Sequence, residues 1–210
     1  MPVTAKICGL STPDTLGAAI AGGARQIGFV FFAPSPRNLD FDRARALAAL
    51  VPAHVEKVGV FVDPDETLLE TAIAATGLDT VQLHKVTPER AAAIRRRIPV
   101  WAAVAVKTPD DLAAATAFAG AADRILYDAK TPDSAALPGG MGLRFDWTLL
   151  RGYAHPLPWA LSGGLSPDNV AEAIRVTGAT SVDVSSGVES APGIKDVDKI
   201  AAFLKAVTSL

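Results

Sequence analysis

The chain has 210 residues, 50% of them hydrophobic and 20% charged, and a formal net charge of −2 at pH 7. This composition excludes an intrinsically disordered chain, and the single cysteine excludes a disulfide scaffold. The near-neutral charge gives no sign of nucleic-acid binding, and no uncharged apolar run reaches the roughly 18 residues that span a membrane. Residues 1–8 lack the features of a signal peptide. We therefore expect a cytoplasmic protein with no nucleic-acid or membrane partner.

Short apolar segments typical of β-strands alternate along the chain with alanine-rich segments of helical periodicity. The strands are predicted at residues 3–8, 26–31, 56–62, 79–84, 100–106, 123–128, 158–162 and 180–185. A helical segment follows each strand, and the pattern is weakest in the second, after Asp40, and the sixth, after Leu143. Gly77 and Gly178 stand where helices are expected to end.

A small polar residue, a proline and an acid recur together as a helix-start pattern. The sites are Thr12-Pro13-Asp14, Asp63-Pro64-Asp65, Thr87-Pro88-Glu89, Thr108-Pro109-Asp110, Thr131-Pro132-Asp133 and Ser166-Pro167-Asp168. The first side chain can cap a free N–H, proline suits the first helical turn, and the acid meets the positive end of the helix dipole.

The alternation predicts an α/β fold with one closed parallel sheet, a (β/α)8 TIM barrel. Each strand–helix unit averages about 26 residues, roughly the sum of a strand, a helix and two short loops. The competing architecture is an open doubly wound sheet, which usually has about five or six strands. The strand number favours the barrel, formed as a single domain over residues 1–210.

Polar residues gather where the predicted strands end, the rim at which barrel enzymes carry their active sites. Cys8, His84 and Asp128 end strands one, four and six, and Arg37 follows strand two. Each has a purely structural alternative: a buried small thiol, a hydrogen-bonded core histidine, an ion-paired or capping carboxylate, and a solvated surface arginine.

The loops after strands seven and eight form a candidate phosphate site. They contain Gly163, Gly164, Ser185, Ser186 and Gly187, and backbone N–H groups in these two loops bind phosphate in many barrels. A simple turn at the glycine pair is the alternative.

Neither a metal nor a cofactor is predicted. The histidines, His54, His84 and His155, are scattered and have no ligand spacing with Cys8, and no Gly-x-Gly-x-x-Gly motif follows a strand. Segment 131–143 is the longest without a clear pattern, and both a mobile flap over the site and a plain surface loop remain open.

Strand alternation also predicts a buried ion pair. Lys6 and Asp183 each lie two residues before a rim residue, so both point into the barrel, on strands that become neighbours when it closes. An unpaired charge there is costly, so we expect the two side chains to pair.

Nine ordered segments, from about residue 5 to the last helix, resemble phosphoribosylanthranilate isomerase of tryptophan biosynthesis. They are Lys6-Ile7-Cys8-Gly9, Gly28-Phe29-Val30-Phe31, Ser35-Pro36-Arg37, Val58-Gly59-Val60-Phe61-Val62, Val81-Gln82-Leu83-His84, Asp128-Ala129-Lys130, Phe145-Asp146-Trp147, Leu161-Ser162-Gly163-Gly164-Leu165 and Val182-Asp183-Val184-Ser185-Ser186-Gly187-Val188-Glu189. The sequence departs from the family pattern at Lys85, commonly glycine, and at Met141, commonly asparagine.

The resemblance implies a cofactor-independent barrel enzyme that performs an Amadori rearrangement of a small phosphosugar, as a monomer or homodimer. It implies that Cys8 is the general base, Asp128 the general acid and Arg37 the contact to the anthranilate carboxylate. We place His84 with Arg37 and the two phosphate loops among the substrate-binding residues. An acid that keeps its proton near neutral pH requires a raised pKa at Asp128.

Two other functions are open to a phosphate-binding barrel: a different phosphosugar isomerase and a binding protein without catalysis. The histidine-pathway isomerase requires acids at the ends of strands one and five, where this chain has Cys8 and Val106-Lys107. A non-catalytic phospholigand-binding barrel needs the glycine loops but not Cys8 and Asp128 together.

Overall fold

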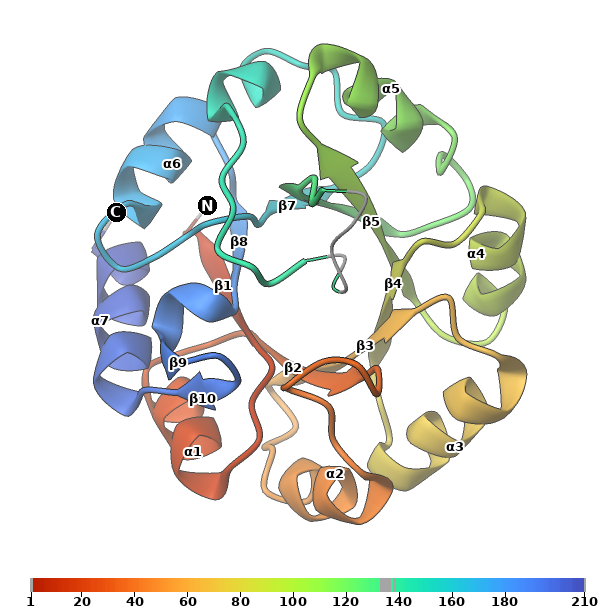
Figure 1. Ribbon diagram of the computed structural model, residues 1–210, viewed down its shortest axis with the longest axis vertical. Helices are drawn as coiled ribbons and strands as arrows, with labels where there is room; N and C mark the ends of the chain where they lie inside the picture. Colours follow the sequence, from red (N-terminus) through yellow and green to blue (C-terminus); the bar gives the residue numbers. More distant parts are fainter. Residues whose placement is uncertain (1, 133–136, 138, 210) are drawn as a thin grey trace.

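A ring of strands surrounded by helices forms the molecule in this computed structural model, which describes residues 2–132, 137 and 139–209 (Figure 1). The barrel strands are β1 (Thr4–Cys8), β2 (Gln26–Phe31), β3 (Glu56–Val62), β4 (Thr80–His84), β5 (Val100–Val106), β6 (Arg124–Ala129), β7 (Trp159–Leu161) and β8 (Ser181–Val184). The α-helices are α1 (Pro13–Ala21), α2 (Phe41–Ala48), α3 (Glu66–Thr76), α4 (Pro88–Arg95), α5 (Pro109–Thr116), α6 (Val170–Thr177) and α7 (Val197–Thr208). Short 3-10 helices η1 (Trp147–Leu150) and η2 (Ser186–Val188) and a hairpin of β9 (Glu189–Ala191) and β10 (Ile194–Lys195) are also present. None of the helices in the described residues has the length and apolar character that crossing a membrane requires.

The sheet closes on itself. Each barrel strand pairs in parallel with its neighbour along the chain, and β8 pairs in parallel with β1, where the register sets Lys6 beside Asp183. This closure confirms the predicted (β/α)8 barrel and excludes the open doubly wound sheet, whose edge strands stay unpaired. The carboxyl ends of the strands therefore meet at one rim, which we call the carboxyl rim.

The predicted strand boundaries agree closely with the observed ones. Segments 26–31, 56–62 and 100–106 coincide with β2, β3 and β5, and the others differ by one residue at one or both ends. The sixth helical segment is wrong as an α-helix, because η1 is the one helical element among the described residues between β6 and β7. Asp146 caps it by accepting the Thr148 N–H at 2.9 Å, and Gly152, at φ 71°, turns the chain away soon after.

Helix starts were predicted correctly at Thr12, Thr87 and Thr108, which are the N-caps of α1, α4 and α5. The predicted helix ends at Gly77 and Gly178 are also confirmed, since both are left-handed C-caps, with φ of 59° and 73°.

Two other helices start later than predicted. The φ of Asp63 is 42°, so α3 is capped instead by Asp65, which accepts the Leu68 N–H at 2.8 Å. Helix α6 is preceded by Asn169, whose side-chain Oδ1 accepts the Ser166 N–H at 2.8 Å, so Ser166 begins a turn rather than the helix. The predicted start at 131–133 includes residue 133, which lies outside the described residues.

The apolar core lies between the barrel and the helices, where outward strand residues such as Ile7 and Phe29 are fully buried. Inside the barrel, below the carboxyl rim, the packing is polar instead. The Lys6 ammonium donates to Asp183 at 2.8 Å and to Gln82 at 2.9 Å, and Ser162 donates to the second Asp183 oxygen at 3.1 Å. The predicted ion pair is confirmed, and Lys6 has no solvent exposure.

We expect Lys6→Met to lower the free energy of unfolding by about 3–5 kcal/mol, because it leaves the Asp183 carboxylate buried without its cation. Urea unfolding at neutral pH measures the loss. The double variant Lys6→Met/Asp183→Asn removes both charges and should recover part of the stability. A single variant as stable as the double one contradicts the assignment of a buried charged pair.

Candidate active site

A cavity opens at the carboxyl rim, and it brings together most of the predicted site residues. Its lining includes Cys8, Arg37, His84, Asp128, Gly163, Gly164, Ser185 and Ser186. The polar layer of Gln82, Ser162 and Asp183 also borders it. In the described part of the chain, no group of three or more histidine, cysteine or acidic side chains is arranged to hold a metal ion.

Asp128 projects from the end of β6 into this cavity, and only 8% of the residue is exposed. One carboxyl oxygen accepts the N–H of Ala129 at 2.8 Å. Burial and the neighbouring Asp183 carboxylate raise the pKa of Asp128 to about 7, while the Ala129 N–H and the Lys6 ammonium oppose this rise more weakly. A carboxyl group that is still half protonated at neutral pH can act as a general acid.

Two glycines give Asp128 its space. A Cβ on Gly163 would lie 3.2 Å from a carboxyl oxygen of Asp128 and 2.7 Å from the Ala129 nitrogen. A Cβ on Gly139 would overlap the other oxygen. The glycines at these positions therefore let the backbone approach the carboxyl group closely, which keeps it sheltered from water.

Cys8 ends β1, and its thiol points into the same cavity. A Cβ on Gly28 of the adjacent strand β2 would lie only 2.9 Å from the sulfur, so glycine there leaves room for the thiol. Burial raises the pKa of Cys8, the Lys6 and Lys195 ammonium groups oppose that rise, and the Asp183 carboxylate adds to it. The resting group at neutral pH is therefore the thiol, and the thiolate is a strong base when it forms.

His84 is both a hydrogen-bonded buried residue and a cavity residue. Lys6 can only donate, so the Gln82 carbonyl oxygen faces Lys6 and the Gln82 amide nitrogen faces His84 Nε2, at 2.8 Å. The Nε2 atom must then accept, which places the ring proton on Nδ1. Burial and the nearby Lys6 ammonium lower the pKa of His84 to about 4, so the ring is neutral at pH 7 and offers one N–H donor.

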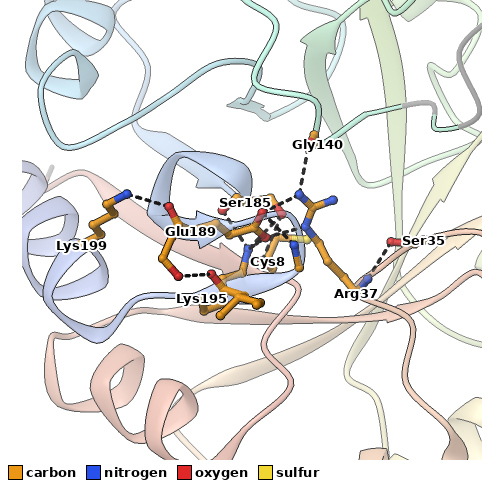
Figure 2. A network of polar contacts seen from close by, with 11 residues as sticks. Cys8, Ser35, Arg37, Gly140, Ser185, Glu189, Lys195 and Lys199 are labelled. Atoms are coloured by element: carbon orange, nitrogen blue, oxygen red, sulfur yellow. Dashed lines mark hydrogen bonds and ion pairs between the residues drawn. The ribbon is translucent and has the colours of Figure 1, made fainter.

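Arg37 is not a solvated surface residue, because only 6% of it is exposed. Its Nε and Nη2 donate to the two carboxylate oxygens of Glu189 at 2.7 and 2.8 Å, and Nη2 also donates to the Gly140 carbonyl at 2.9 Å (Figure 2). This edge of the guanidinium is therefore occupied. Among the described residues only Nη1 lacks an acceptor, so any ligand carboxylate meets Nη1 rather than the edge formed by Nε and Nη2.

The loops after the neighbouring strands β7 and β8 lie side by side at the rim. Gly163 and Gly164 have φ of 85° and 67°, in the left-handed region that suits glycine. The N–H groups of Gly164 and Ser186 have no acceptor among the described residues, which suits an anion site. Gly187 does not line the cavity, contrary to its predicted place beside Ser186. A Cβ there would overlap the Leu165 carbonyl, so Gly187 lets the two loops pack together.

The described part of segment 131–143 covers the cavity, so it is not a surface loop remote from the site. A Cβ on Gly140 would lie 2.8 Å from Arg37 Nη1, and Met141, which departs from the family pattern, lines the cavity while 48% exposed. Residues 133–136 and 138 of the segment lie outside the described residues. The other departure, Lys85, has a φ of 56°, which explains why glycine is common at this position.

Sequence reasoning assigned no role to Gln82, which lines the cavity, nor to Glu189 and Lys195, which lie beside it. Gln82 lies two residues before His84, so strand alternation was a sufficient signal that it points into the barrel. Glu189 and Lys195 follow β8 in a short hairpin, where no periodicity indicates what their side chains contact.

A closed parallel barrel with an acid, a thiol and an arginine in one cavity at its carboxyl rim defines a (β/α)8-barrel enzyme. Residues 5–206 match the family model described as N-(5'phosphoribosyl)anthranilate (PRA) isomerase. The chain belongs to this family. The N-(5'-phosphoribosyl)anthranilate isomerase of Zymomonas mobilis is 55% identical over 214 residues, covering 100% of both chains. That of Paramagnetospirillum magneticum is 54% identical, covering 98% of this chain and 97% of the relative.

Solved structures of the same family resemble this chain over nearly its whole length. The phosphoribosyl anthranilate isomerase of Thermotoga maritima superposes with a TM-score of 0.90 at 37% identity, covering 99% of this chain and 100% of the other. Another structure of the family is a complex with reduced 1-(o-carboxyphenylamino)-1-deoxyribulose 5-phosphate, with a TM-score of 0.87, 34% identity and coverage of 99% and 100%. A third solved structure of the family is that of monomers generated from the dimeric Thermotoga maritima isomerase.

Asp128→Asn should stabilise the protein in alkaline solution. The pKa of Asp128 rises from 3.8 to about 7 on folding, so its stabilising contribution is present below pH 3.8 and is lost as the pH rises through 7. Asparagine has no proton to lose and can still accept the Ala129 N–H. We expect the variant to match the parent near pH 4 and to exceed it by up to about 4 kcal/mol near pH 8.

Urea unfolding at the two pH values gives this difference. A gap between variant and parent that stays the same at both would show that the Asp128 carboxyl titrates as an ordinary aspartate.

Proposed function

We propose that this protein catalyses the Amadori rearrangement of N-(5'-phosphoribosyl)anthranilate to 1-(2-carboxyphenylamino)-1-deoxyribulose 5-phosphate in tryptophan biosynthesis. The observation that carries the proposal is the shared cavity of Cys8 and Asp128, in which the pKa of Asp128 is raised to about 7. Membership of the PRA isomerase family supports it. The reaction oxidises C2′ and reduces C1′ of the same molecule, and hydrogen moves only as protons.

The first step opens the aminoribose ring. In our proposal the protonated Asp128 carboxyl delivers its proton to the furanose oxygen as the bond from that oxygen to C1′ breaks. The anthranilate nitrogen supplies the electron pair that forms the C1′–N double bond, so a protonated Schiff base results. Positioned proton transfer of this kind commonly contributes about 10²–10⁴-fold to the rate.

The second step moves the double bond. The Cys8 thiolate takes the proton from C2′, and the C2′ electrons form an enolamine while the C1′–N double bond returns its electrons to nitrogen. The enolamine then gains a proton at C1′ and loses one from the C2′ hydroxyl, which gives the aminoketone. Acid and base act on one substrate from different strands, β6 and β1.

The remaining cavity residues hold the substrate in this proposal. The Arg37 Nη1 group meets the anthranilate carboxylate, and a charged pair of this kind also fixes ring orientation. The N–H groups of Gly164 and Ser186 bind the phosphate, as backbone groups in these loops of barrels often do. Neutral His84 offers its Nδ1–H to a substrate oxygen.

We further propose that the protein works in the cytoplasm as a single barrel domain over residues 1–210, as a monomer or homodimer, without nucleic-acid or membrane partners. The small net charge of −2 supports the absence of a polyanionic partner.

Loss of the acid or the base should nearly abolish activity. We expect Asp128→Asn and Cys8→Ala each to lower kcat by at least about 10²–10⁴-fold, and Cys8→Ser only slightly less than Cys8→Ala, because a hydroxyl is a poor base. The measurement follows substrate consumption by purified protein, together with growth of a tryptophan auxotroph that lacks the isomerase. Near-normal turnover by Asp128→Asn overturns the assignment of the acid, and a parent protein that neither turns over nor complements overturns the function.

The pH profile of kcat/KM should have two limbs. The productive pair has a protonated Asp128 and an ionised Cys8, so together the two groups hold one proton. The pKa of Asp128 is about 7 and that of Cys8 lies above its usual 9.0, so the pair holds one proton between these values. We expect the rate to fall below about pH 7, where a second proton binds, and again at high pH, where the last is lost.

Asp128→Asn provides the control for this profile, because Cys8 is then the one group of the pair that titrates. Its residual activity should rise with pH as the Cys8 thiol ionises and should lose the fall at high pH. Activity of the parent that falls steadily from about pH 5 upward is incompatible with this pair.

A further inference from the structure

Glu189 is the centre of a buried network beside the cavity (Figure 2). One carboxylate oxygen accepts from Arg37 Nε and from Lys195 Nζ, both at 2.7 Å. The other accepts from Arg37 Nη2 at 2.8 Å and from the Gly193 N–H at 3.2 Å. Glu189 is not part of the cavity lining. It therefore reaches a ligand only through the groups it holds.

The carboxylate lies between two buried cations. Arg37 is 6% exposed and the Lys195 side chain 1% exposed, and without an anion between them their charges would repel at low dielectric. Hydrogen bonds from Arg37 and the charge of Lys195 outweigh the effect of burial and lower the pKa of Glu189, which keeps it ionised. The three groups together leave one net positive charge at this wall, which complements an anionic ligand.

Arg37 is fixed on every side except the one toward the cavity. A Cβ on Gly9 would lie 2.7 Å from its Cδ, so the side chain packs directly over the end of β1. The Gly140 carbonyl takes one Nη2 hydrogen, and Glu189 takes the edge formed by Nε and Nη2. A long arginine side chain loses rotamer freedom when it binds a ligand, and here that freedom is removed beforehand.

We propose that Glu189 is a positioning residue for the isomerase reaction. It aims Nη1 of Arg37 at the aromatic carboxylate of the substrate, and so contributes to recognition of the anthranilate group without touching it. This inference rests on the function proposed above and deepens it, because it assigns selection of the aromatic part of the substrate to the pair of Arg37 and Glu189.

The competing explanation is that Glu189 only holds the hairpin of β9 and β10 in place. Through Lys195, whose ammonium donates to the Ser185 carbonyl at 2.8 Å, the same carboxylate also supports the loop after β8. A purely structural role would then weaken the phosphate site at least as much as the carboxylate site. The two explanations therefore differ in which end of the substrate loses affinity.

The test compares Glu189→Gln, Arg37→Met and the double variant in the full-length protein. Calorimetry measures the Kd of reduced 1-(o-carboxyphenylamino)-1-deoxyribulose 5-phosphate, and inhibition kinetics measure the Ki of inorganic phosphate. We expect Glu189→Gln to raise KM and this Kd about 10-fold, a typical effect of a hydrogen bond to a charged group, with kcat changed far less and the phosphate Ki unchanged. In the Arg37→Met background the same substitution should add nothing, because Glu189 acts through Arg37.

Two further variants complete the design. Glu66→Gln makes the same chemical change at an exposed glutamate paired with Arg90 and Arg97, and should leave all three constants at the parent values. Glu189→Asp keeps the charge on a shorter side chain, and should bind the analogue better than Glu189→Gln does. If Glu189→Gln does not fold, Glu189→Asp takes its place, with a raised analogue Kd and an unchanged phosphate Ki expected.

Three outcomes would each overturn the proposal. Glu189→Gln could bind the analogue as tightly as the parent does, its phosphate Ki could rise as much as its analogue Kd, or the losses in the double variant could be additive. Any of these results with normal turnover by the parent removes the role of Glu189 and leaves the proposed function intact. A parent protein without turnover refutes the function, and the inference that rests on it falls too.

Discussion

The ion pair between Lys6 and Asp183 joins the first and last strands of the barrel, and the cavity above it depends on this pair. Lys6 is fully buried, and its ammonium lies 2.8 Å from the Asp183 carboxylate. Burial alone would lower the pKa of Lys6, but the Asp183 carboxylate and Cys8 together more than compensate, so the pKa is raised and the group stays charged. Removing two charges from water is costly, and it is balanced here only because Gln82 and Ser162 supply further hydrogen bonds.

The same pair sets the charge state of the groups that face the cavity. The Asp183 carboxylate raises the pKa of both Asp128 and Cys8, while the Lys6 ammonium lowers both and also lowers the pKa of His84. Through Gln82, Lys6 fixes which nitrogen of His84 carries the proton. An apolar pair of similar size could serve the closure of the barrel equally well, or better. We therefore attribute the charged pair to its effect on the pKa values of the cavity residues rather than to a gain in stability.

Local rules were enough to predict the barrel and the side chains inside it. Alternation along a strand showed that Lys6 and Cys8 share a face, and closure of the sheet then brought Lys6 beside Asp183. The environment of Arg37 was beyond such rules. Its partner Glu189 lies 152 residues further along the chain, in a hairpin with no periodic pattern, so the sequence did not show that one edge of the guanidinium is already occupied. Gly187 shows the same limit, because its role depends on the carbonyl of Leu165 in another loop.

Burial raises the pKa of both groups that the reaction needs, but with opposite consequences for the chemistry. It favours the neutral form of each, and that form is the useful one for the acid Asp128 but the idle one for the base Cys8. At a pH between the two pKa values, the resting pair has its proton on sulfur, and the productive pair has it on the carboxyl group. Both states hold one proton, so moving it from Cys8 to Asp128 changes no net charge in the cavity.

The free-energy cost of moving the proton from Cys8 to Asp128 is set by the gap between their two pKa values. Lys195 narrows the gap by stabilising the thiolate, whereas Lys6 lowers the pKa values of both groups. The thiolate that forms is a stronger base because its pKa is raised. Lys195 thus limits the cost of forming the thiolate, while burial preserves its basicity.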